Sequence, residues 1–157
     1  MEIKTKVNGK VHKVDVPANW SLADFLKKRL GLIGVKLGCE AGECGSCTVL
    51  VNGEPINSCL MLALEADGKE IETIEGLSKN GKLHPLQDAF VKYSAIQCGF
   101  CTPGMILSAK ALLDKNPSPT EDEIRTALEG NICRCTGYVK PMEAIMSVAS
   151  KKKKKKV

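Results

Sequence analysis

The chain of 157 residues is poor in aromatic side chains, which make up 4% of it, and it has only two histidines. Aliphatic residues must therefore fill its core. No stretch approaches the roughly 18 apolar residues of a membrane span, and the residues from Met1 to Lys4 lack the apolar core of a signal peptide. We therefore expect a cytoplasmic protein with no transmembrane segment, in which cysteines are kept as thiols or metal ligands.

A true excess of positive charge is also missing. Six of the 23 basic residues form the run Lys151–Lys156, and removing these six leaves 17 basic residues against 18 acidic ones. The balanced remainder shows none of the basic surface that binding to nucleic acid needs. We predict that residues 151–157 form a disordered, solvated tail. Contact with an anionic membrane surface or an acidic partner is the alternative for this tail.

The sequence has no nucleophile–base constellation and no phosphate-binding loop, so we expect no turnover of an organic substrate by this chain alone. Cysteine, in contrast, is abundant, with eight residues in two sets. Cys39, Cys44 and Cys47 follow the spacing C-x4-C-x2-C, and Cys59 lies a short distance downstream. This is the spacing of plant-type [2Fe–2S] ligation by four thiolates. A zinc site or a disulfide is the alternative, but zinc sites usually use C-x2–4-C pairs.

The second set consists of Cys98, Cys101, Cys133 and Cys135, with each pair just ahead of an expected helix. Two helix N-termini would thus direct free N–H groups and positive dipole ends toward one site, which suits an anionic four-thiolate cluster. Four cysteines can also hold zinc, although C-x-C is an awkward zinc pair. A second [2Fe–2S] cluster is the favoured interpretation.

The first half of the chain has the pattern of a sheet with one helix. Asn8-Gly9 is a strong hairpin signal between two alternating segments, and Ser21 is placed to cap a helix that begins at Leu22 and has Gly31 just past its end. The expected strands cover residues 2–7, 10–16, 48–51 and 70–74. This order predicts a β-grasp sheet wrapped over one helix.

The second half has only helical patterns. Helices are expected to start at Pro85, Pro103, Thr120 and Pro141, which predicts a small four-helix bundle. The predicted fold class is therefore α+β. Its expected parts are residues 1–76 as a sheet domain, 77–83 as a linker, 84–150 as a helical domain and 151–157 as the tail.

Three stretches together resemble the iron–sulfur subunit of molybdenum hydroxylases, the family of xanthine dehydrogenases, aldehyde oxidoreductases, carbon monoxide dehydrogenases and 4-hydroxybenzoyl-CoA reductases. They are the Cys39–Cys59 segment, QCGFCTPG at Gln97–Gly104, and GNICRCTGY at Gly130–Tyr138. The resemblance covers residues 1 to about 150, and only the lysine run departs from it.

The resemblance implies an N-terminal β-grasp, plant-type ferredoxin domain and a C-terminal four-helix-bundle domain, each with one [2Fe–2S] cluster. It also implies a large partner subunit that holds molybdenum on molybdopterin, and a medium subunit that binds FAD. Electrons would pass from molybdenum to the helical-domain cluster, then to the ferredoxin-domain cluster, and then to flavin or another acceptor. Gln97 and Cys135 would contact the molybdopterin.

Two other functions are compatible with parts of this pattern. One is a free-standing two-cluster ferredoxin-like electron carrier, which would have no need of the helical domain, and the other is a zinc- or disulfide-stabilised interaction protein. We expect His12 and His84 to be ordinary surface or boundary residues, because neither has a partner at ligand spacing. Arg134 either neutralises a cluster or pairs with a partner group. Glu40 and Glu43 either keep the loop soluble or shape a docking surface.

Overall fold

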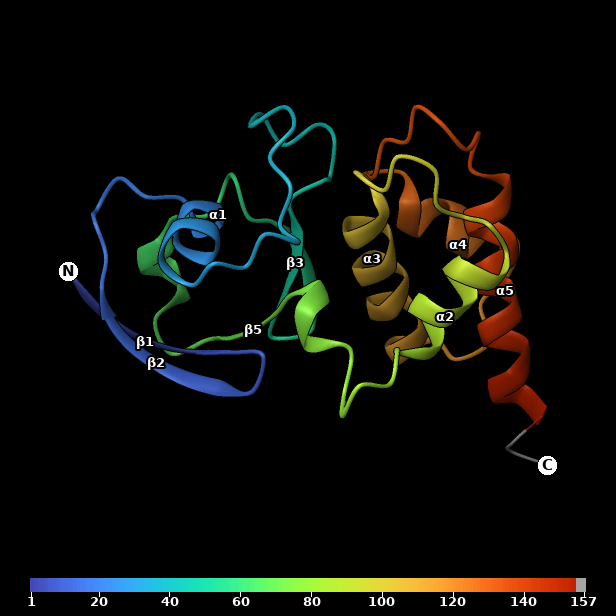
Figure 1. The fold of residues 1–157 in the computed structure, drawn as a ribbon, viewed down its shortest axis with the longest axis horizontal. Coiled ribbons are helices and arrows are strands. Elements are labelled where there is room, and N and C mark those ends of the chain that lie inside the picture. The colour runs from blue at the N-terminus through green and yellow to red at the C-terminus, as the bar shows by residue number, and fades with distance from the viewer. Residues whose placement is uncertain (155–157) are drawn as a thin grey trace.

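The computed structural model describes residues 1–154, with side chains through residue 149. A mixed five-stranded sheet with a short helix lies beside a group of helices (Figure 1). The strands are β1 (Glu2–Val7), β2 (Lys10–Asp15), β3 (Thr48–Val51), β4 (Glu54–Asn57) and β5 (Glu70–Glu72). Their order in the sheet is β2-β1-β5-β3-β4, and only β1 and β5 run parallel. The α+β class predicted from the sequence is confirmed.

The predicted hairpin at the N-terminus is present. Asn8 and Gly9 have φ angles of 49° and 82°, as a tight turn between antiparallel strands requires. Alternate residues of β1 are buried, whereas Val11 of β2 is 62% exposed. The difference arises because Val11 pairs with the exposed Lys6 of β1 and therefore lies on the solvent face of the sheet.

The predicted helix after Ser21 is also present, with an irregular end. Helix α1 (Leu22–Asp24) continues directly as the π-helical turn η1 (Phe25–Arg29). The hydroxyl of Ser21 accepts a hydrogen bond from the backbone N–H of Asp24, as expected of an N-cap. Leu22, Phe25 and Leu26 are fully buried against the sheet and form the centre of the first core.

Two features of the sheet differ from the sequence prediction. Strand β4 was not expected, because it is an exposed edge strand with a proline, Pro55, and therefore has no alternating apolar pattern. Strand β5 ends at Glu72 instead of residue 74, since Ile74 begins the short 3-10 helix η3 (Ile74–Gly76). Another 3-10 helix, η2 (Ala63–Ala66), follows the apolar segment after Cys59.

The four predicted helices of the second half are present. They are α2 (Pro85–Lys92), α3 (Thr102–Lys115), α4 (Glu121–Leu128) and α5 (Val139–Lys154). Helix α5 begins two residues before Pro141, and it includes the first four lysines of the predicted tail, which therefore continue the helix. Residues 155–157 of that tail lie outside the described part of the chain.

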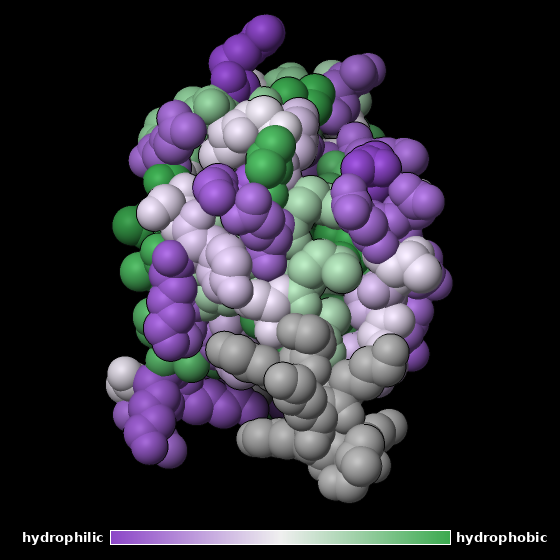
Figure 2. Space-filling view, turned by 90° about the vertical axis from the view of Figure 1, so that its right-hand side faces the viewer, coloured by the Kyte–Doolittle hydropathy of each residue, from purple (hydrophilic) through white to green (hydrophobic). Residues whose placement is uncertain are grey.

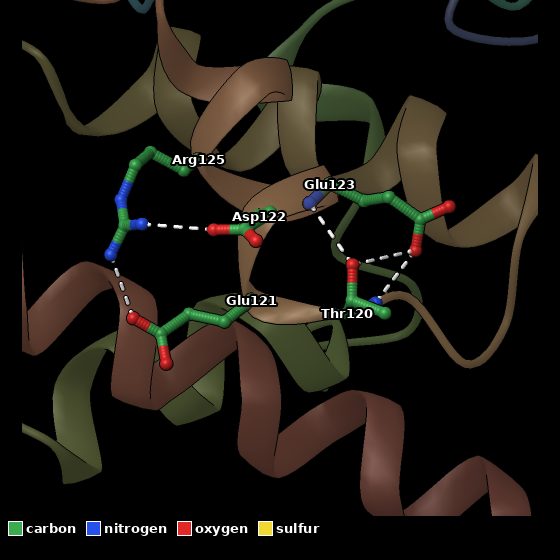
Figure 3. Close-up of polar contacts among 5 residues, drawn as sticks. All are labelled: Thr120, Glu121, Asp122, Glu123 and Arg125. Carbon is green, nitrogen blue, oxygen red and sulfur yellow. Dashed lines mark hydrogen bonds and ion pairs between the residues drawn. The ribbon is translucent and has the colours of Figure 1, made fainter.

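The start of α4 shows how the capping residues define a helix boundary (Figure 3). The hydroxyl of Thr120 accepts from the backbone N–H of Glu123, and the carboxylate of Glu123 accepts from the backbone N–H of Thr120. Arg125 pairs with Glu121 at 2.8 Å and with Asp122 at 3.0 Å. These contacts confirm the predicted capping box and add a local ion-pair group on the exposed side of α4.

The two halves share an interface. The side chain of Leu50, a residue of β3, packs in the hydrophobic cluster of the helical half, where it joins Leu77 and residues of α3. The amine of Lys110 on α3 lies 3.0 Å from the carboxylate of Glu72 on β5, and Lys115 pairs with Glu54 at 2.6 Å. The segment between the halves also contributes, since Lys79 and Lys82 pair as a short bridge and Leu77 is buried.

The outer face of the helical half carries a groove of about 650 Å³ between α4 and α5. Leu128, Val139, Met142 and Met146 line it, with Arg125 among its charged residues. Figure 2 views this end of the molecule, where hydrophobic side chains show in a hollow flanked by hydrophilic ones. None of the helices in the described residues is long and apolar enough to cross a membrane.

Candidate iron–sulfur sites

The β3–β4 hairpin brings the first cysteine set together. Cys47 directly precedes β3 and is buried, and Cys59 follows β4 two residues after its end. Thr48 pairs with Asn57 in this hairpin, so the two cysteines at its open end lie next to each other. The hydroxyl of Ser58 donates to the backbone oxygen of Cys47 at 2.6 Å and holds the two chain segments together.

The loop that carries Cys39 and Cys44 turns its backbone N–H groups toward sulfur. The N–H groups of Ala41 and Cys44 each lie 3.4 Å from the Cys39 sulfur. These hydrogen bonds lower the pKa of the Cys39 thiol to about 7. The amide of Asn57 donates to the backbone oxygen of Gly42 at 2.9 Å and steadies the loop from β4. The loop therefore favours a thiolate at its exposed end.

The second set comes from two separate segments of the helical half. Cys98 and Cys101 precede α3, and Cys133 and Cys135 lie in the loop between α4 and α5. This loop and the loop before β3 both reach the upper edge of the molecule in Figure 1. The sulfurs of Cys98 and Cys135 are 3.6 Å apart. The fold thus joins two pairs of cysteines that more than thirty positions separate in the printed sequence.

Hydrogen bonds hold the Cys133 loop in place. The backbone N–H of Cys133 donates to the hydroxyl oxygen of Tyr138 at 2.9 Å, and the N–H of Thr136 donates to the Cys133 sulfur at 3.4 Å. Burial by itself raises the pKa of the Cys133 thiol, but the bonds from Thr136 outweigh it and the pKa is lowered overall. Burial raises the pKa of the neighbouring Cys101 thiol to about 12. The two thiols of this pair therefore differ strongly in acidity.

The sulfurs of each set lie as two pairs. In the first set Cys39 contacts Cys44 and Cys47 contacts Cys59. In the second set Cys98 contacts Cys135 and Cys101 contacts Cys133. These four pairs account for all eight cysteines of the chain. In the part of the chain that the structure describes, no group of three or more His, Cys, Asp or Glu residues is placed to hold one metal ion.

All four cysteines of the second set line a hollow of about 220 Å³. Its wall also includes Gly38, Cys44 and Ser46 from the first loop. Phe100 and Ile132 supply its apolar surface. The loop of the first candidate site therefore borders the second candidate site.

The remaining predicted site residues take varied positions. Gln97 and Cys135 are both exposed. Gln97 directly precedes Cys98 in the sequence, and the Cys135 sulfur lies next to the Cys98 sulfur in space. Arg134, Glu40 and Glu43 are exposed as well, and Glu40 has a left-handed φ of 54°.

Each of the two histidines has a defined place. His12 is half-buried on β2. His84 is the N-cap of α2, where its Nδ1 accepts from the N–H of Leu86 at 3.2 Å. His84 is therefore a boundary residue, as expected, with a capping function that the sequence reasoning did not assign.

Asn131 and Ser58 are buried polar residues of the candidate sites that sequence reasoning missed. Asn131 is 3% exposed and bonds to three other residues, and Ser58 is fully buried. Neither residue is of a type that binds iron in such sites. Their role is to form buried hydrogen bonds, and no local sequence pattern reveals which residues are buried. The only available signal was their proximity in sequence to Cys133 and Cys59.

Comparison with known proteins gives two family matches, one for each half. Residues 5–78 match the family described as "2Fe-2S iron-sulfur cluster binding domain", and residues 73–146 match "[2Fe-2S] binding domain". The chain is 51% identical over 143 residues to the nicotinate dehydrogenase small FeS subunit of Eubacterium barkeri, covering 91% of each chain. It belongs to the iron–sulfur subunits of the molybdenum hydroxylases.

Solved structures agree with this membership. A chain in the crystal structure of quinoline 2-oxidoreductase from Pseudomonas putida 86 matches with a TM-score of 0.94 and 48% identity, over 100% of this chain and 98% of that one. The aldehyde oxidoreductase of Desulfovibrio gigas matches with a TM-score of 0.93 and 42% identity, over 99% of this chain but 17% of that one. As an iron–sulfur subunit of this family, the chain transfers electrons within an oxidoreductase complex.

Proposed function

We propose that the eight cysteines form two four-thiolate [2Fe–2S] sites. Cys39, Cys44, Cys47 and Cys59 hold the first, and Cys98, Cys101, Cys133 and Cys135 hold the second. The observation that carries the proposal is the arrangement of the sulfurs in two pairs per set. Each iron of a [2Fe–2S] cluster takes two thiolates, so this arrangement suits two irons better than one zinc.

An unsatisfied polar atom beside the second set supports the same assignment. The hydroxyl of Thr102 is buried and has no hydrogen-bond partner among the described residues. Thr102 directly follows Cys101 at the start of α3. A buried donor without a partner is costly, and sulfur at this site would accept its hydrogen bond. The residues present therefore fit an iron–sulfur group.

In this proposal the sheet half and the helical half are two separate domains, and each binds one cluster. Residues 1–76 form a β-grasp, ferredoxin-type domain, 77–83 a linker, and 84–150 a four-helix domain. The mixed sheet packed on α1 and the separate cores of the two halves support this division. When bound, each cluster takes up and releases single electrons. Different hydrogen bonding and burial in the two domains would give the clusters different reduction potentials.

The exposed pair of the second set is the proposed entry point for electrons. Cys98 and Cys135 face outward beside the exposed Gln97. A molybdopterin held by a large partner subunit would dock there, with Gln97 offering both a donor and an acceptor to its edge. Electrons would leave from the first set to a FAD-binding subunit or another acceptor. The D. gigas aldehyde oxidoreductase chain, in which the matching region is a small share, supports a large partner.

The substrate of the whole enzyme belongs to the partner chain in this proposal. The relatives are named for nicotinate, for quinoline and for aldehydes, while their iron–sulfur portions all match this chain closely. We also propose that the enzyme works in the cytoplasm, where thiols are available for cluster loading.

Iron and acid-labile sulfide analysis of the purified chain tests the assignment. The expected result is two irons and two sulfides per cysteine set, with two distinct paramagnetic signals after reduction. One tightly bound zinc in place of the second pair of irons would overturn the assignment for Cys98, Cys101, Cys133 and Cys135. Matched measurements on the chain purified with its partners show whether substrate reduces both clusters.

A further inference from the structure

The side chain of Asn131 is buried at the point where the two halves of the molecule meet. Its Nδ2 donates to the backbone oxygen of Gly45 at 3.0 Å and to the hydroxyl of Thr48 at 3.3 Å. Its Oδ1 accepts from the hydroxyl of Ser108 at 2.7 Å. A buried amide with both ends bonded is a rigid connector, because each broken bond would leave a buried polar atom unpaired.

Each partner of Asn131 lies on a segment that carries cysteines. Gly45 stands between Cys44 and Cys47, and Thr48 directly follows Cys47. Ser108 is on α3, the helix whose N-cap is Cys101. Asn131 itself is two residues before Cys133. One side chain therefore bonds to segments of both cysteine sets.

The next residue completes a direct link between the sets. The backbone N–H of Ile132 donates to the backbone oxygen of Cys44 at 3.0 Å. Cys44 belongs to the first set, and Ile132 is joined by one peptide bond to Cys133 of the second. The sulfurs of Cys133 and Cys44 are thus connected by covalent bonds with a single hydrogen bond between them.

The packing around this link leaves no room for adjustment. A Cβ on Gly45 would clash with the backbone oxygen of Gly130, and a Cβ on Gly104 would clash with the backbone oxygen of Gly45. Gly45 also has a left-handed φ of 66°. Glycine at these positions lets three backbones approach closely, and the Asn131 amide joins them.

We propose that Asn131 is the positioning residue for electron transfer between the two clusters, because it holds the Ile132 N–H on the Cys44 carbonyl. The inference rests on the proposed ligand sets. The transfer moves one electron from the second set to the first and forms or breaks no bond. Asn131 touches neither sulfur set in this role, and it acts through the distance and orientation between them.

The test uses the full chain with both clusters loaded and compares Asn131→Ala with Asn116→Ala. Asn116 is the matched control, since its amide is also bonded at both ends, to Glu123 and Ser118, on segments that carry no cysteine. Two readouts are measured: the magnetic splitting between the two reduced clusters, and the rate at which electrons redistribute between them after rapid partial reduction. Iron content and the separate spectrum of each cluster show that the sites remain intact.

We expect Asn131→Ala to keep both clusters and both spectra, to reduce the splitting and to slow the redistribution, while Asn116→Ala changes neither. Parental splitting and rate in Asn131→Ala would overturn the proposal, as would equal slowing in Asn116→Ala. If Asn131→Ala fails to fold, Ser108→Ala decides, because it removes one bond of the amide and leaves the others. Slower redistribution in Ser108→Ala supports the proposal, and the parental rate refutes it. A parent chain that loads no second iron pair would refute the ligand sets themselves, which is a distinguishable failure.

Discussion

The sulfurs of both cysteine sets lie in two pairs, but different structural elements bring them together in each set. The first set needs only one loop and the adjoining β3–β4 hairpin, so local chain geometry brings Cys59 to Cys47. The second set needs α3 and α4 to pack before Cys98 and Cys135 meet. A site built by neighbours in sequence forms with its loop, whereas a site built by distant segments depends on the packing of a whole core.

Despite this difference, each set has one inner and one outer pair. Cys47 with Cys59 and Cys101 with Cys133 are the more buried pairs, and burial raises the pKa of Cys59 to about 11 and that of Cys101 to about 12. Cys39 and the Cys98–Cys135 pair are exposed. The buried pairs connect each site to its core, and Cys39, Cys98 and Cys135 face the molecular surface.

The strongest test of the comparison removes one ligand from each set. Cys44→Ala should remove the first iron pair and leave the second, and Cys133→Ala should do the reverse, because each thiolate serves a separate site. Iron and sulfide content should fall by half in each variant, with one paramagnetic signal kept. Loss of both signals from either variant would show that the two sites do not load independently.

A second test addresses the shared interface. Leu50→Ala should lower the free energy of unfolding by about 2–5 kcal/mol, the usual cost of a buried leucine truncation. The loss should fall mainly on the helical half, because the Leu50 side chain packs there. Val49→Ala is the control, since Val49 packs in the core of the sheet half. Thermal unfolding followed at each cluster's own absorption distinguishes loss of the helical half from loss of the sheet half. Equal loss from both halves in Leu50→Ala would mean that they unfold as one unit.

A smaller effect is expected at the outer face of the second set. Gln97→Leu replaces the amide with an apolar side chain of similar size that cannot form hydrogen bonds, so both clusters should load normally. In the complete enzyme, loss of one hydrogen bond worth about 0.5–1.5 kcal/mol should weaken pterin retention and slow cluster reduction by substrate. Stopped-flow reduction and pterin content measure this. Parental rates in an assembled variant would place Gln97 away from the cofactor.

The smallest effect is expected at the α4 cap (Figure 3). Thr120→Ala should cost about 1 kcal/mol of stability and leave both clusters unchanged. Hydrogen bonds from the backbone N–H and from the hydroxyl of Thr120 hold the pKa of Glu123 below its ordinary value, and alanine removes only the hydroxyl bond. The part of the difference between parent and variant that comes from this bond should therefore be full above the ordinary pKa of glutamate and be lost as pH falls through the lowered one. Chemical denaturation at several pH values checks this, and a difference that grows toward acid pH would contradict it.

Much of the fold could be predicted from local signals. Asn8-Gly9, Ser21 and Thr120 act within one turn of the chain, so their positions in the sequence indicate where the hairpin and the two helices begin. Strand β4 could not be predicted, because an exposed edge strand buries too little to leave a pattern. The end of β5 and the continuation of α5 into the lysine run were missed for a similar reason, since segment ends depend on neighbours as much as on residue type.

The sequence by itself determined which residues are the candidate ligands, because sulfur ligation needs cysteine and its spacing is visible in the chain. Only the tertiary structure decided how the sulfurs pair, since Cys98 and Cys135 meet through helix packing. It also decided that the two sets lie beside each other, linked by Asn131 and by the bond from Ile132 to Cys44. A buried amide of this kind has no sequence pattern of its own, because its partners are backbone and hydroxyl groups that become neighbours only when both cores have formed.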